Sequence, residues 1–194
     1  MKRIILLSLI TSVLITSSCT RKVTRVNPDK QIDLSGRWND VDSKMVADEI
    51  TKQVLGEKWL SNFSQTHAGK KPVVIVGFVK NSSHEHIEAE TFIKNIEIAF
   101  INSGLVTLVQ GGEKRQEIRG EKADQQDNAS QSTMKKWGLE IGADFMMQGD
   151  INSIVDSYKR DKVVFYKINL ELTNIQTSEV VWIGDKELKK EVRN

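Results

Sequence analysis

The sequence predicts an α+β domain of two layers, a mixed or antiparallel sheet of about five strands flanked by helices. From Val164 to Leu172 every second residue is large and apolar, which is typical of a strand with one buried face. Apolar runs at 145–151 and 180–183 lie on either side of it, across breaks short enough for hairpin turns. These three runs predict a C-terminal antiparallel meander, and helical patterns alternate with shorter apolar runs upstream.

The N-terminus has the pattern of a signal peptide, predicted over residues 1–18. Two basic residues precede residues 4–15, of which only three are polar. This apolar stretch is too short to span a bilayer as a stable helix, but it suits a secretory signal. Cys19, the only cysteine, directly follows Thr16-Ser17-Ser18. Small residues before a cysteine at this place resemble the lipobox of bacterial lipoproteins, which implies cleavage before Cys19 and lipidation of its thiol.

A lipidated Cys19 would anchor the protein to a membrane, since each buried methylene of an acyl chain contributes about 0.8 kcal/mol. No aspartate follows Cys19, which favours the outer membrane with the protein facing the periplasm. The alternative is an incidental cysteine inside an ordinary cleaved signal.

Residues 19–40 are mostly polar and predict a short flexible tether, followed by a single globular domain over residues 41–194. A tether of this length reaches about 70 Å at most, and about 25 Å on average as a coil. Leu34 and Trp38 stand out in it, either as a strap that packs on the domain or as a plug for a partner. We favour the strap, because apolar residues beside a domain are usually recruited to it.

The first half of the domain predicts two helical segments and a strand. Asp40 or Asp42 can cap a helix with an apolar stripe through residues 46–54, interrupted at Gly56 and continued to about residue 65. The continuous apolar run at 73–79 predicts a central strand that is buried on both faces.

Further elements lead to the meander. Ser82 or Ser83 is expected to cap a helix with an acidic first turn, which ends at Asn102-Ser103-Gly104. A short strand is expected at 105–109 and a short helix at 134–141. The polar stretch at 110–133 is either a solvated helix with loop ends or a mobile excursion.

The residues show no constellation for catalysis, so we predict no catalytic, cofactor-binding or metal-ligating residue and no enzyme activity. No nucleophile elbow is present, and Gly111-Gly112-Glu113-Lys114 lacks the spacing of a phosphate-binding loop. His84-Glu85-His86 with Glu88 is the one candidate metal site, and we interpret it as a surface segment that caps a helix. The net charge of +2 is mild and evenly distributed, which argues against nucleic acid as a partner. No small-molecule substrate is indicated.

Three segments carry a family resemblance. Residues 142–149, Leu170-Glu171-Leu172 and residues 176–184 resemble the LpoB-type activators of penicillin-binding proteins, which are outer-membrane lipoproteins of Gram-negative bacteria. The resemblance spans roughly residues 41–188 and implies a fold similar to the N-terminal domain of TolB. Ser178 stands where the family has a turn glycine, which suits a turn that is not strongly left-handed. The tether is also much shorter than in the best-known member.

The resemblance implies a partner and a function. The expected partner is the periplasmic docking region of a bifunctional (class A) penicillin-binding protein, whose glycosyltransferase and transpeptidase the lipoprotein stimulates. An alternative is an envelope assembly or secretion lipoprotein that acts as a protein adaptor. A peptidoglycan hydrolase is the third hypothesis and the one that the residues favour least.

Overall fold

A computed structural model describes residues 21–28, 30–130, 132 and 139–193. The chain divides into two units, Met1–Gln31 and Ile32–Asn194. The described residues of the first unit are exposed and form no helix or strand. The predicted signal peptide, Cys19 and positions 134–138 of the predicted third helix lie outside the described residues. The domain boundaries at 18 and 40 stay predictions.

The second unit is built on a five-stranded mixed sheet. Its strands are β1 (Val73–Ser82), β2 (Thr107–Leu108), β3 (Phe145–Tyr158), β4 (Asp161–Asn174) and β5 (Val180–Val192). Their order is β2-β1-β3-β4-β5, with β1 parallel to both neighbours and β3, β4 and β5 antiparallel. This topology confirms both the predicted fold class and the C-terminal meander.

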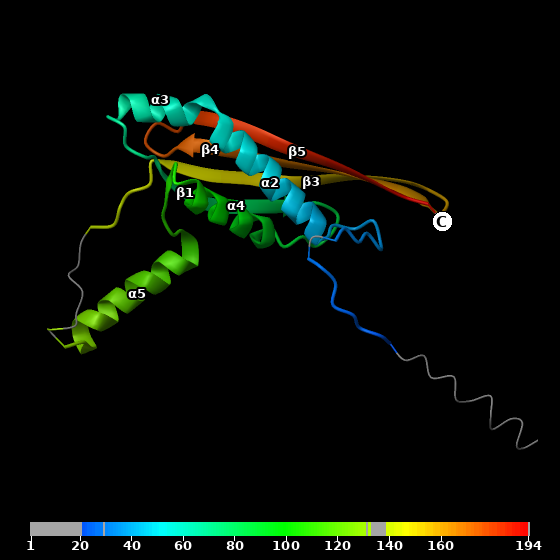
Figure 1. The fold of residues 1–194 in the computed structure, drawn as a ribbon, viewed down its shortest axis with the longest axis horizontal. Coiled ribbons are helices and arrows are strands. Elements are labelled where there is room, and N and C mark those ends of the chain that lie inside the picture. The colour runs from blue at the N-terminus through cyan, green and yellow to red at the C-terminus, as the bar shows by residue number, and fades with distance from the viewer. Residues whose placement is uncertain (1–20, 29, 131, 133–138, 194) are drawn as a thin grey trace, which may run out of the picture. The chain divides into compact units, whose positions relative to one another are not determined.

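Helices cover one face of this sheet (Figure 1). They are α2 (Asp40–Gly56), α3 (Lys58–Thr66) and α4 (Glu90–Ser103), while α5 (Gly112–Asn128) has no buried residue. The break at Gly56 is confirmed, but Asn39 rather than Asp40 or Asp42 is the N-cap of α2. The Asn39 side chain accepts a hydrogen bond from the Asp42 N–H, and the Asp42 carboxylate accepts one from the Asn39 N–H, which completes a capping box.

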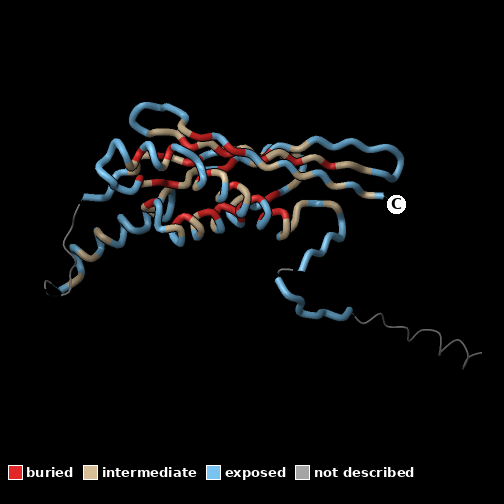
Figure 2. Tube along the Cα trace, turned by 45° about the horizontal axis from the view of Figure 1, so that its top comes forward, coloured by how far each residue is buried: buried red, intermediate tan, exposed pale blue. Residues whose placement is uncertain are grey.

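The core lies between α2, α4 and the inner face of the sheet, where the buried stretches of these elements face one another (Figure 2). Alternate residues of β4 point into it, as the sequence pattern predicts. The largest fully buried side chains are Tyr166, Phe92, Phe100, Ile50, Ile96, Met147, Ile151, Ile168, Leu170, Leu172, Val46 and Val54.

Two predicted helix positions are wrong. The helix expected to start after Ser82 or Ser83 begins at Glu90, because β1 runs to Ser82 and residues 83–89 form a loop. Asn81 holds this loop: its side chain accepts from the Ser83 N–H at 3.0 Å and donates to the Glu85 carbonyl at 2.9 Å. Residues 139–141 are also not helical. Gly104 ends α4 with a φ of 63°, as predicted.

The second face of the sheet differs from the prediction for β1. Phe78 is 74% exposed, whereas we expected this strand to be buried on both faces. On this second face of β1, Ile75 is buried. Gly111 packs so closely against it that an added Cβ at Gly111 would lie 2.8 Å from the Ile75 side chain. Strand β5 is longer than the apolar run at 180–183 that predicted it, because it continues to Val192. Alternate charged residues in this extension suit a strand whose outer face is solvated.

The turn between β4 and β5 is left-handed at Ser178, with a φ of 61°, and this contradicts the expected turn geometry. Such a conformation costs a non-glycine residue about 1 kcal/mol. Asn174 compensates, because its carbonyl accepts from the Ser178 N–H and its side chain accepts from the N–H groups of Gln176 and Thr177.

Candidate partner-binding surface

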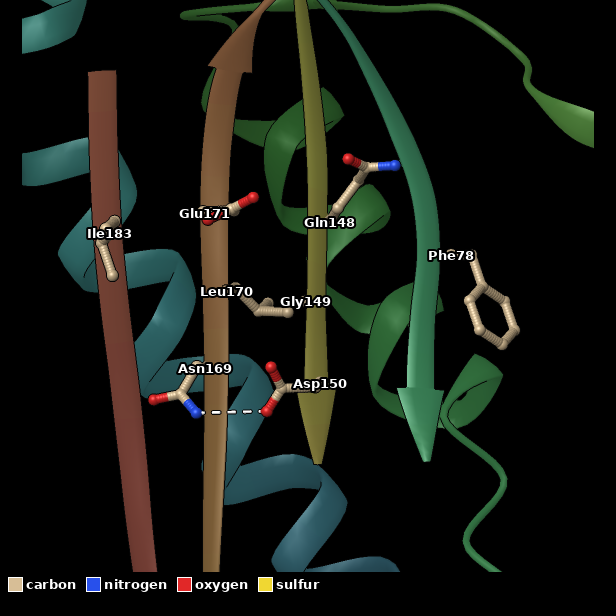
Figure 3. A pocket seen from close by; sticks show the side chains of 8 residues that line it. All are labelled: Phe78, Gln148, Gly149, Asp150, Asn169, Leu170, Glu171 and Ile183. Atoms are coloured by element: carbon tan, nitrogen blue, oxygen red, sulfur yellow. Dashed lines mark hydrogen bonds between the residues drawn. The ribbon is translucent and has the colours of Figure 1, made fainter. Parts of the chain in front are cut away.

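The face of the sheet that α2 and α4 leave uncovered exposes both apolar and polar side chains. We call it the open face. It is formed by outward side chains of β1, β3, β4 and β5, namely Phe78, Lys80, Gln148, Asp150, Ile154, Lys167, Asn169, Glu171, Ile183 and Asp185. Figure 3 views its centre with the helices behind the strands.

Strand register arranges these side chains in rows that cross the sheet. Gln148, Glu171 and Ile183 are direct neighbours on β3, β4 and β5. Asp150 and Asn169 form the adjacent pair of β3 and β4, and the Asn169 amide donates to the Asp150 carboxylate at 3.2 Å (Figure 3). This bond holds the Asn169 and Asp150 side chains together.

A shallow hollow of about 300 Å³ lies in the middle of the open face, around Gly149. An added Cβ at Gly149 would lie 2.1 Å from the Asn169 carbonyl oxygen and 2.4 Å from a Leu170 methyl group. Only glycine therefore lets β3 and β4 pair at this point. Gly149 is also the last residue of 142–149, the first of the three segments that carry the family resemblance.

Large apolar side chains flank the polar centre. Phe78 is 74% exposed, Ile183 67% and Ile154 68%. Exposed large apolar side chains of this kind are a feature of surfaces that another protein covers. The sequence does not indicate this surface, since alternation shows that a strand has two different faces but not which face the helices leave uncovered.

The segment that leads into α2 is tied to the sheet by a buried ion pair. Lys190 Nζ lies 2.6 Å from the carboxylate of Asp42, which is 2% exposed, and 3.0 Å from that of Asp33. The same ammonium donates to the Arg37 carbonyl at 2.9 Å. Residues 32–39, which we call the strap, are thereby fixed to the end of β5.

Trp38 confirms the strap hypothesis, and Leu34 does not. The Trp38 ring packs edge-on against Tyr166, with centroids 5.5 Å apart, and its indole N–H donates to the Ser43 hydroxyl at 2.9 Å. Leu34 is 92% exposed, although Asp33 beside it contacts Lys190 of β5.

One serine and one histidine come together near the loop at 83–89. The Ser153 hydroxyl lies 2.7 Å from His84 Nδ1, but it also accepts from the His84 backbone N–H at 2.9 Å. The Glu85 carboxylate is 3.7 Å from His84 Nε2 and accepts a hydrogen bond from the Tyr166 hydroxyl. Burial, together with Glu85, raises the pKa of Tyr166 above its usual range. These contacts hold the loop against β3 and β4, and Ser153 was not singled out from the sequence.

The predicted candidate metal segment is a loop rather than a helix cap. His86 pairs with Glu88 at 2.5 Å, while His84 turns to Ser153. Within the described ranges, no group of three or more histidine, cysteine, aspartate or glutamate side chains is placed to hold a metal ion.

The polar stretch at 110–133 forms α5 over most of its described length, which supports the solvated-helix alternative. The Arg119 guanidinium donates two hydrogen bonds to the Glu140 carboxylate, at 3.0 and 2.9 Å, and these bonds lower the pKa of Glu140 to about 2. Lys122 lies 3.6 Å from the same carboxylate. Glu140 therefore lies beside the middle of α5. None of the helices in the described residues has the length and apolar character needed to cross a membrane.

The fold and the open face describe a class of protein: an α+β domain with one sheet face covered by helices and the other suited to a protein partner. Residues 42–188 match the family described as peptidoglycan-synthase activator LpoB. Since the match spans most of the chain, the protein belongs to the LpoB family. A comparison with curated proteins finds no significant match.

Solved structures resemble this domain at low identity. The LpoB C-terminal domain from Escherichia coli is 18% identical, with a TM-score of 0.43, over 79% of this chain and 99% of that chain. The same domain from Salmonella enterica is 18% identical, with a TM-score of 0.41, over 76% and 98%. Lipoprotein GNA1162 from Neisseria meningitidis is 11% identical, with a TM-score of 0.41, over 64% and 86%. Because these TM-scores are low, the family assignment rests on the sequence match.

Proposed function

We propose that this protein is a non-catalytic outer-membrane lipoprotein that binds a bifunctional (class A) penicillin-binding protein and activates it in peptidoglycan synthesis. The observation that carries the proposal is the match of residues 42–188 to the peptidoglycan-synthase activators. The open face supports it, because an activator without its own chemistry must act through a contact surface.

The docking surface in this proposal is the open face, and its occupant is the periplasmic docking region of the synthase. Ile183 and Phe78 would supply the apolar contacts, and Asp150 and Glu171 the polar ones. Since a few large side chains carry most of the binding energy of an interface, Ile183, an exposed apolar side chain that lines the hollow, is the residue to test.

Ile183→Lys is expected to weaken synthase binding and stimulation at least tenfold, because a charged side chain would enter the apolar part of the contact. Ile101→Lys on α4 is the matched control: Ile101 is 62% exposed against 67% for Ile183, but it lies away from the open face. The full chain in detergent is titrated against each class A synthase of the same cell, and binding and glycosyltransferase rate are measured.

The two outcomes that oppose the proposal are distinct. Unchanged binding by Ile183→Lys would contradict the open face as the docking surface, but it would not contradict the activator function. Failure of the unmodified protein to bind or stimulate any of the synthases would remove the activator function, and recovery of secretion or assembly components after crosslinking in cells would favour the adaptor alternative.

Lipidation of Cys19 is the proposed anchor, with the protein facing the periplasm. Cys19→Ala is expected to move the protein from the outer-membrane fraction to the soluble periplasmic fraction, as measured by fractionation and blotting. Cys19→Ala that stays with the membrane would contradict acylation. Labelling with a clickable palmitate analogue checks the same point independently.

The anchor places a limit on where the partner can dock. Because the second unit begins at Ile32, the tether runs from Cys19 to Gln31. At about 3.5 Å per extended residue it reaches roughly 45 Å. The proposal therefore requires the docking region of the synthase to come close to the outer membrane.

A further inference from the structure

One edge of the sheet, on the side of β1 that faces β2, is left partly unpaired. Strand β2 pairs only with Val73 and Val74, and the last hydrogen bond along this edge runs from the Val109 N–H to the Val74 carbonyl at 3.0 Å. Strand β1 continues to Ser82, and no strand in the described residues pairs with it on that side.

The backbone of β1 keeps its hydrogen-bonding groups turned to this edge. Val79 and Asn81 share the inward register of Val74, opposite Gly149 and Ile151 of β3. Since the side-chain direction and the backbone direction alternate together along a strand, their N–H and C=O groups turn to the same edge as those of Val74. An unpaired edge of this kind is a template for an added strand.

A groove of about 680 Å³ adjoins this edge at residues 76–78, between β1, the side of α4 and the start of α5. The apolar side chains that line the groove include Phe78 and Ile93. Its charge is acidic, and the lining glutamates are Glu90, Glu97, Glu113 and Glu117. Lys114 is the lysine that lines it, and nearby Lys94 is paired with Glu97.

The charge of the groove selects the occupant. Two copies of this edge would bring eight carboxylates together, which disfavours edge-to-edge pairing of the protein with itself. A basic extended segment, by contrast, gains both main-chain hydrogen bonds and opposite charge.

We propose that the free edge of β1 binds an extended segment of a partner protein that combines basic and apolar residues, adding it to the sheet as a further strand. The main-chain groups of Val79 and Asn81 supply the affinity, and the four glutamates and the apolar groups select the side chains. Apart from Phe78, which borders both, this surface is separate from the open face, and the proposal does not depend on the synthase as partner.

The test uses the full chain in detergent and a fluorescent peptide, Lys-Val-Lys-Val-Lys-Val, with blocked termini. Fluorescence anisotropy is expected to show saturable binding, at least tenfold weaker for the same peptide with its valine nitrogens methylated, since methylation removes the strand N–H donors. Amide exchange of residues 77–82 is expected to slow at least fivefold when the peptide is bound.

Matched variants separate the groove from general charge. Glu113→Gln with Glu117→Gln is expected to weaken binding at least fivefold. Glu121→Gln with Asp124→Asn removes the same two charges from the same helix outside the groove and is expected to change binding less than twofold. Equal loss in both double variants, equal binding of the methylated peptide, or no binding of the peptide at all would each overturn the proposal.

Discussion

Gly149→Ala is expected to lower the free energy of unfolding by about 3 kcal/mol, because the added methyl group has no space between β3 and β4. Its position would be 2.1 Å from the Asn169 carbonyl oxygen and 3.0 Å from the Leu170 Cα. Both are backbone atoms in the middle of the sheet, so neither can turn aside as a side chain would. Urea denaturation followed by circular dichroism measures the effect.

Gly120→Ala is the control for this substitution. Gly120 lies in α5, and no atom lies within 4 Å of an added Cβ there. Since alanine is a better helix former than glycine, Gly120→Ala should stabilise α5 by up to about 1 kcal/mol. A Gly149→Ala protein as stable as the unmodified one would show that β3 and β4 can separate at this point without cost.

Lys190→Met is expected to lower the free energy of unfolding by about 3 kcal/mol, since it leaves the buried Asp42 carboxylate without its cation. Asp42 is 2% exposed and Lys190 14%, so water screens this pair little. The substitution also removes the donor to the Arg37 carbonyl. The strap should loosen, and the near-ultraviolet circular dichroism of Trp38 should weaken at temperatures where the domain is still folded.

Lys189→Met tests whether the effect belongs to the ion pair. Lys189 is exposed on the opposite side of the same strand, and a surface change of this kind is expected to stay within about 0.5 kcal/mol. Adding Asp42→Asn to Lys190→Met should recover part of the stability, because the unpaired charge is then removed. No recovery would mean that the ion pair is not the source of the loss.

The local patterns in the sequence predict much of the fold. The alternation of apolar and polar residues identifies β4. The end of α2 at Gly56 and the end of α4 before Gly104 are each marked in the sequence by a single glycine. The start of α4 was wrong because Ser82 and Ser83 resemble helix caps, whereas Asn81 uses the same chemistry to close a loop. The sequence alone does not distinguish a helix cap from a loop closed by the same kind of hydrogen bond. Tertiary contacts, such as the burial of Ile87, decide which of the two forms.

The candidate surfaces were much less predictable. Phe78 belongs to an apolar run that suits a strand buried on both faces, yet it is exposed, and none of the helices in the described residues packs over it. Lys190 is one of many lysines in the sequence, and its role appears only when β5 places it beside Asp42. Neither position carries a sequence pattern of its own.

The sequence by itself determined the order of the strands in the meander, the membership in the LpoB family and the position of the candidate lipid anchor, because each is carried by patterns of residues that are close together in the chain. Only the tertiary structure decided which sheet face stays open, which edge of β1 stays unpaired and how Lys190 holds the strap. These features depend on which distant surfaces cover one another: a face or an edge is free only where no other part of the chain has packed on it.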